Sequence, residues 1–322
     1  MAQREFPHPE RERSSEPSQD ASCSSGASVD GPAVAKADRA ARTWQGAIAG
    51  PIPIGSEAHK SLFCRMLLDT FNPYKPAIID WPALSEAERA RLVSLPIWDI
   101  AVATEGKAKL RVLSYGAQVK DPLLAEAIRL NGFEEGRHKD VLANLVAAYG
   151  IVLGEEPPYL TPRDAEWAFM VTGFSECIDS FFAFGLFELA KRSGFFPPDL
   201  VDTFEPVIQE EARHILLFAN WLSWHRRTMP FWRRPWFEAR VIAVWGFLIW
   251  ERIGIARSVD SGDNNFTVNG SQSVSNTDVS PGTLLRISLA ENDRRFAGYD
   301  PRLLRPTTVP SLARFALHFL RG

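Results

Sequence analysis

One pentapeptide pattern, E-E-x-R-H, occurs twice in the chain, at Glu134–His138 (EEGRH) and at Glu210–His214 (EEARH). In an α-helix, residues three positions apart project from nearly the same face. Each copy therefore presents one carboxylate and one imidazole to the same point in space: Glu135 with His138, and Glu211 with His214. One such pair is half of a metal site, and a second helix that faces the first would supply the other half.

A further glutamate precedes each copy at the distance of a helical hairpin, Glu105 before the first and Glu176 before the second. Glu176 lies among apolar residues, where a buried carboxylate needs a partner. Glu166 and Glu188 are the alternatives to Glu176 on the same predicted helix. Four glutamates and two histidines, with Glu-x-x-His on two helices and one Glu on each of the other two, form the ligand set of di-iron carboxylate bundles.

With these motifs, residues 95–228 resemble the ferritin-like di-iron superfamily. The arginine within E-E-x-R-H is similar to that of soluble acyl-carrier desaturases and bacterial multicomponent monooxygenases. The resemblance implies a set of metal ligands and leaves open which pair of glutamates bridges the ions: Glu105, Glu135, His138, Glu176, Glu211 and His214. It also implies that Glu134 and Glu210 accept hydrogen bonds from the ligand imidazoles and pair with Arg137 and Arg213, which would fix the imidazole tautomer.

The helical period of the apolar residues predicts an all-α fold, a ferritin-like four-helix bundle with additional N- and C-terminal helices. Long helices are predicted at about 96–118, 122–150, 163–192 and 198–228. Asp121-Pro122 and Thr161-Pro162 have the pattern of helix starts, and Gly150 that of a helix end. The predicted segments are a disordered tail (1–43), lead-in helices (44–95), the bundle (96–228), a Trp/Arg-rich hydrophobic helix (229–258), a flexible insertion (259–281) and C-terminal helices (282–322).

Composition limits the function classes. The chain has 322 residues and 45% hydrophobic content, which is enough for one large domain with appendages. Its formal net charge of -3 gives no indication of nucleic acid as a partner. The three cysteines, Cys23, Cys64 and Cys177, are odd in number and form no C-x-x-C pattern, which favours a reducing, cytoplasmic compartment.

Phenylalanines at helical spacing flank Glu176 in the third predicted helix. Such a row usually packs in a core, but close to a metal ligand it can also exclude water and line a channel for an apolar substrate. The candidate pocket residues are Thr172, Phe181 and Phe184. Asp179, three positions after Glu176, is a candidate ligand or a neighbour of the ligands.

Six of the ten tryptophans lie between Trp221 and Trp250, together with five arginines. The apolar run Val241–Trp250 is too short to span a bilayer, which takes about 20 residues. Two interpretations stay open. The segment 230–258 is either a helix that packs over the bundle or an interfacial helix in peripheral contact with a membrane.

Mixed carboxylate and imidazole coordination suits two iron ions, with an Fe/Mn pair as the alternative. The leading hypothesis is a dioxygen-dependent oxidoreductase that hydroxylates, desaturates or otherwise oxidises an apolar small-molecule or acyl substrate. The chain contains no flavin, nicotinamide or iron–sulfur motif, so a separate reductase is expected as electron donor, and a homodimer is a further expectation. The alternatives are a ferritin- or rubrerythrin-like ferroxidase or metal-handling protein without an organic substrate, and a membrane-surface scaffold.

Overall fold

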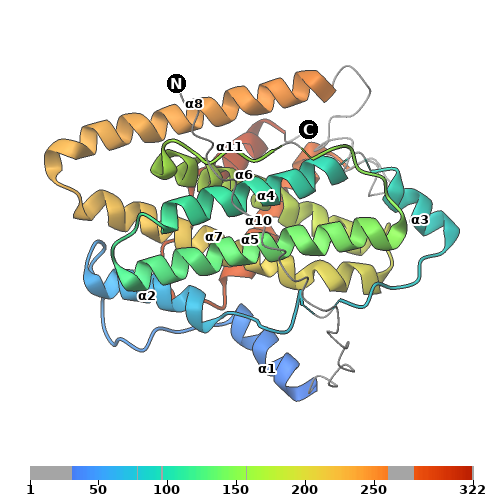
Figure 1. The fold of residues 1–322 in the computed structure, drawn as a ribbon, viewed down its shortest axis with the longest axis horizontal. Helices are drawn as coiled ribbons and strands as arrows, with labels where there is room; N and C mark the ends of the chain where they lie inside the picture. The colour runs from blue at the N-terminus through green and yellow to red at the C-terminus, as the bar shows by residue number, and fades with distance from the viewer. Residues whose placement is uncertain (1–30, 78, 96, 157, 260–278, 321–322) are drawn as a thin grey trace, which may run out of the picture.

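The computed structural model describes residues 31–77, 79–95, 97–156, 158–259 and 279–320. Throughout these ranges the chain forms helices joined by loops and no β-strand. An isolated parallel bridge pairs Trp44 with Tyr299. The predicted all-α class is confirmed (Figure 1).

Four long helices contain the residues of the repeated motif and the two additional glutamates. The predicted capping residues delimit the second of them: the Asp121 carboxylate accepts a hydrogen bond from the Leu124 N–H, Pro122 is the first helical residue, and Gly150 adopts a left-handed φ of 67°. A second left-handed glycine, Gly194, ends the third. The four helices are α4 (Trp98–Gly116), α5 (Pro122–Tyr149), α6 (Ala165–Ser193) and α7 (Pro198–Thr228).

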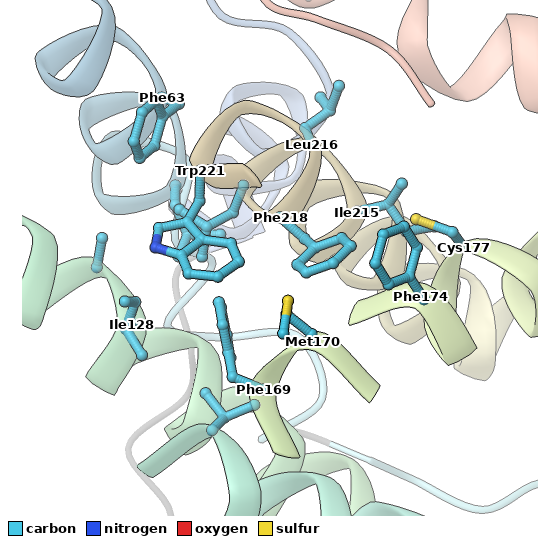
Figure 2. Packing of buried hydrophobic residues seen from close by; sticks show 14 of the residues in the cluster. Phe63, Ile128, Phe169, Met170, Phe174, Cys177, Ile215, Leu216, Phe218 and Trp221 are labelled. Atoms are coloured by element: carbon cyan, nitrogen blue, oxygen red, sulfur yellow. The ribbon is translucent and has the colours of Figure 1, made fainter. Parts of the chain in front are cut away.

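Contacts link α4 to α5, α5 to α7, α7 to α6 and α6 back to α4. A shorter helix, α2 (Glu57–Asp69), packs against both α5 and α7. Aromatic side chains fill one end of the space between these helices, where Figure 2 shows Phe169, Phe218 and Trp221 together. Trp221 is fully buried, and its ring meets that of Phe169 edge to face at 4.7 Å.

The remaining helices surround this centre. Helix α8 packs on α6 after a short 3-10 turn, α10 packs on α6, and α11 packs on α6 and α10. Helix α3 belongs to a separate apolar cluster, in which its Leu92 packs near Tyr149 and Leu200. These elements are α3 (Glu86–Val93), η1 (Phe231–Arg233), α8 (Arg234–Val259), α10 (Pro281–Phe296) and α11 (Thr308–Phe319).

The end of the predicted disordered tail is helical: Gly31–Arg42 form α1. The reason is tertiary contact rather than local composition. The Arg42 guanidinium donates to Glu205 of α7 at 3.0 Å, and the Tyr299 hydroxyl donates to the Ala41 carbonyl. Residues 1–30, and positions 260–278 of the predicted flexible insertion, lie outside the described residues.

Helix α6 is long and apolar enough to cross a membrane by length and composition. More than half of its most apolar stretch is buried inside the protein. Core helices of soluble proteins have the same character, so this helix gives only weak evidence for a membrane span.

Candidate metal centre

Helices α5 and α7 bring the two E-E-x-R-H motifs face to face. One ligand atom from each of four side chains lies within 4.8 Å of the others: Glu135, His138, Glu211 and His214. Both imidazoles are buried, and their ring centres are 5.5 Å apart. This group could hold a metal ion.

Each imidazole is oriented by the opposite motif. The Nε2 atom of His138 lies 2.8 Å from Glu210, and that of His214 lies 2.8 Å from Glu134. A carboxylate only accepts hydrogen bonds, so Nε2 carries the hydrogen and, in a neutral ring, the lone pair is on Nδ1. In the neutral ring, which is the form that binds a metal, both Nδ1 atoms therefore present a lone pair toward the centre of the group.

The arginine of each motif likewise binds the outer glutamate of the opposite motif, and we call this reciprocal set of hydrogen bonds the exchange between the motifs. Arg137 donates to Glu210 at 2.6 Å, and Arg213 donates to Glu134 at 2.8 Å. The sequence predicted these residue types as partners, and in the structure each of these four hydrogen bonds joins one motif to the other. The result is a buried network in which each outer glutamate binds one imidazole and one guanidinium.

Helix α2 completes this network. Arg213 also donates to the Leu67 carbonyl at 2.6 Å and to the Thr70 hydroxyl at 2.7 Å, and Arg137 donates to the Asn72 carbonyl at 2.9 Å. Carbonyls at a helix C-terminus lack partners within the helix and favour a positive charge. Arg213 thus binds the last turn of α2, and Arg137 binds the loop that follows it, while both pair with the outer glutamates.

The inner atoms of the group lack such partners. Nδ1 of His138 lies 3.0 Å from Glu211, and Nδ1 of His214 lies 2.8 Å from Glu135, yet neither contact has hydrogen-bond geometry. One Glu176 oxygen is also buried without a hydrogen bond. Buried polar atoms without partners are rare and costly. Nitrogen and oxygen donors that converge without partners fit a bound cation.

Glu105 of α4 and Glu176 of α6 lie next to this group rather than within it. A Glu105 oxygen is 3.8 Å from Nδ1 of His138. Burial, together with the nearby charges of Glu135 and Glu211, raises the pKa of both Glu105 and Glu176 well above the ordinary value. Four inward carboxylates without a cation repel one another, and a bound metal would relieve that repulsion.

At the outer carboxylate and the two imidazoles, the pKa shifts favour the charged form. Burial alone would raise the pKa of Glu134, but the Arg213 guanidinium and the His214 imidazole lower it to about 2. Burial would lower the pKa of His138, but the Glu210 and Glu211 carboxylates raise it well above its usual range. For the same reason the pKa of His214, beside Glu135 and Glu134, is raised.

Two polar residues of the centre were not predicted from the sequence. Asn131 donates to Glu135 at 3.0 Å and is buried one turn before it on α5. Its position at i-4 from a ligand is a signal that the sequence did contain. Thr70, the partner of Arg213, is the C-cap residue of α2 and is distant in sequence from both motifs, so it gave no such signal.

The alternative ligands of α6 have other partners. Glu166 binds His225 at 2.9 Å, and Glu188 binds Arg192 at 2.6 Å. Asp179 does not face the centre, because its carboxylate binds Ser175 of its own helix and Arg252 of α8. Helical geometry explains this, since a residue three positions from Glu176 can still lie at the edge of the helix that faces α8.

The candidate pocket residues are all buried. Phe181 packs with Val309 and Ala313 of α11, and Phe184 lies against Phe296 of α10, with ring centres 6.5 Å apart. The Thr172 hydroxyl is buried without a hydrogen bond. Whether any of them contacts a substrate stays a prediction. Cys177 is free and packs in the apolar core.

Comparison with protein-family models, with curated proteins and with solved structures found no match to this chain.

Proposed function

We propose that this chain is a dioxygen-dependent di-iron oxidoreductase with a ferritin-like four-helix bundle formed by α4, α5, α6 and α7. The observation that carries the proposal is the buried Glu/His group on α5 and α7, in which both imidazoles present an Nδ1 atom without a hydrogen bond. The hydrogen bonds from His138 to Glu210 and from His214 to Glu134 further support it. Ligand imidazoles in metalloproteins are oriented in this way, by a carboxylate on the other ring nitrogen.

Six side chains would hold two iron ions, or one iron and one manganese. His138 lies near Glu105, and the charge of His214 acts on Glu176, so the four helices supply two similar sets of ligands. Glu135 and Glu211 each approach the imidazole of the opposite motif. Glu135 and Glu211 would therefore hold metal beside both imidazoles.

Iron in such a ligand set supplies dioxygen activation. The protein itself keeps the imidazoles in one tautomer through Glu134 and Glu210, and it pairs those carboxylates with the guanidinium groups of Arg213 and Arg137. The aromatic residues of α6 and α7 exclude water from one end of the helix assembly. An apolar organic substrate and a separate reductase remain part of the proposal.

The first experiment is the metal content per chain, together with the absorption spectrum after anaerobic loading with Fe(II) and exposure to dioxygen. We expect two irons per chain and an iron-dependent absorption that develops only with dioxygen. One metal or none would overturn the proposal. Uptake of many irons per chain, without oxidation of any apolar substrate in the presence of a chemical reductant, would favour a metal-handling protein instead.

A further inference from the structure

Helix α8 is apolar on the side that faces away from the protein. Every exposed residue from Pro235 to Ile253 is apolar, and successive exposed positions follow the spacing of a helix face. Trp236 is 70% exposed, Ile242 72% and Trp250 71%. We call this surface the outer face of α8; it consists of Trp232 from the adjoining turn η1 and, in α8 itself, of Pro235, Trp236, Ala239, Ile242, Ala243, Gly246, Ile249, Trp250 and Ile253.

The inner face of α8 is fixed to the protein, so the outer face cannot turn inward. Phe237, Val244 and Leu248 are buried in the main apolar cluster. On the flanks, Arg240 binds Asp164 at 2.8 Å, and Arg252 binds Asp179 at 2.7 Å. Figure 1 shows α8 along the outer edge of the molecule. A helix that is apolar on both sides needs an apolar environment on each of them.

Three arginines lie at the Trp232 end of this face. Arg227 and Arg233 are exposed and Arg234 is half-buried. Within the described residues none of the three forms an ion pair, whereas Arg226 of the same region binds Glu238 at 2.6 Å. The Arg234 guanidinium donates only to a backbone carbonyl, that of Arg227. These cations are available to an anionic partner.

We propose that the outer face of α8 docks on a lipid bilayer with anionic headgroups. Tryptophan is favoured at the boundary between headgroups and acyl chains, and guanidinium groups bind headgroup phosphates. A second copy of the chain fits less well. An isologous interface joins identical patches, and the outer face contains no carboxylate to pair with the three arginines. The proposal concerns this surface alone and does not depend on the metal centre.

The test is flotation of the full chain with phosphatidylcholine vesicles that either contain or lack phosphatidylglycerol. We expect binding to the anionic vesicles that weakens with added salt. The double variant Trp236→Glu/Trp250→Glu should bind at least about tenfold more weakly, since two indoles leave the apolar boundary. Arg227→Glu/Arg233→Glu should lose the preference for phosphatidylglycerol. Leu160→Glu, which changes an apolar side chain that is 85% exposed on a different segment, should bind like the unchanged chain.

Far-ultraviolet circular dichroism shows whether each variant keeps its helices, which these exposed positions should allow. The proposal is overturned if the unchanged chain does not float with anionic vesicles, or if the tryptophan variant binds as tightly as the unchanged chain. Light scattering measures the molar mass in solution and so tests whether a second copy of the chain occupies the outer face instead. A dimer that becomes a monomer in Trp236→Glu/Trp250→Glu, without vesicle binding, would make the outer face a contact between copies.

Discussion

The Arg213 guanidinium of the second motif lies 2.8 Å from the Glu134 carboxylate of the first, and both side chains are fully buried. Arg137 and Glu210 repeat the contact in the opposite direction at 2.6 Å. The two motifs therefore form one unit, because each supplies the residue that orients the imidazole of the other. This unit fixes the relative position of α5 and α7, on which the geometry of the candidate metal centre depends.

Removal of Arg213 should destabilise the protein strongly. Arg213→Met leaves Glu134 charged and buried without its main cation, a change that typically costs about 3–5 kcal/mol. The measurement is the free energy of unfolding in urea. Arg192→Met is the matched control, because Arg192 is 58% exposed in its pair with Glu188 and such pairs contribute about 1 kcal/mol or less. Equal stability of the two variants would contradict a structural role of the Arg213–Glu134 contact.

His138→Ala and His214→Ala should each lower the bound metal while the helix content is retained. Each variant removes one Nδ1 donor and leaves a small cavity at the centre. The measurement is iron per chain after anaerobic loading, with circular dichroism as the check on folding. His225→Ala is the control, since His225 binds Glu166 and lies outside the centre. Two irons per chain in either site variant would remove that histidine from the ligand set.

Asp300 should make part of the stability depend on pH. Its carboxylate accepts from Arg302 and from the Gly46 N–H, and these bonds lower its pKa to about 2. A depressed folded pKa gives stability that is complete above the unfolded value of about 3.9 and is lost as pH falls toward 2. Asp300→Asn should therefore be about 1.5–3 kcal/mol less stable at pH 7.

The difference between the unchanged chain and Asp300→Asn should shrink between about pH 4 and pH 2. Urea unfolding at several pH values measures it. Asp202→Asn is the control, because Asp202 is 66% exposed and its pair with Lys191 is long, at 3.6 Å. A difference that stays constant down to pH 2 would show that the Asp300 carboxylate contributes nothing through its charge.

The sequence predicted what depends on local spacing. The i, i+3 pairs, the Asp121-Pro122 start and the Gly150 end are properties of one helix, and the structure shows each of them. The exchange between the motifs was beyond the sequence, because helical spacing says which residues share a face and not which helix lies opposite. In the structure the hydrogen-bond partners of Glu134 are His214 and Arg213 of α7.

Contacts between residues distant in sequence explain the features that the sequence did not predict. His59 of α2, which has no other histidine near it in the sequence, is fully buried. Its Nε2 atom lies 3.0 Å from Asn220 of α7, and its Nδ1 accepts from the Gly55 N–H. The helix α1 within the expected tail likewise depends on Glu205 and Tyr299, which are distant in sequence. Contacts with Asn220, Glu205 and Tyr299 could not be assigned without the fold.

The contact between α6 and α10 gives a last prediction. A Cβ at Gly185 would lie 2.1 Å from the Ser288 hydroxyl and 3.0 Å from its Cα, and Ser288 is fully buried. Because a backbone atom blocks the space, the two helices would have to move apart. Gly185→Ala should therefore be destabilising by about 1–3 kcal/mol in thermal or urea unfolding, in spite of the better helix propensity of alanine.

Gly246→Ala is the matched control on α8, where a Cβ would meet nothing within 4 Å. At that position the substitution changes only the helix propensity, which is higher for alanine than for glycine. The variant should therefore be more stable than the unchanged chain by about 0.5–1 kcal/mol. The two substitutions are chemically identical and both lie inside a helix. Their opposite signs would establish that α6 and α10 are in backbone contact at Gly185, and a stabilising Gly185→Ala would show that they are not.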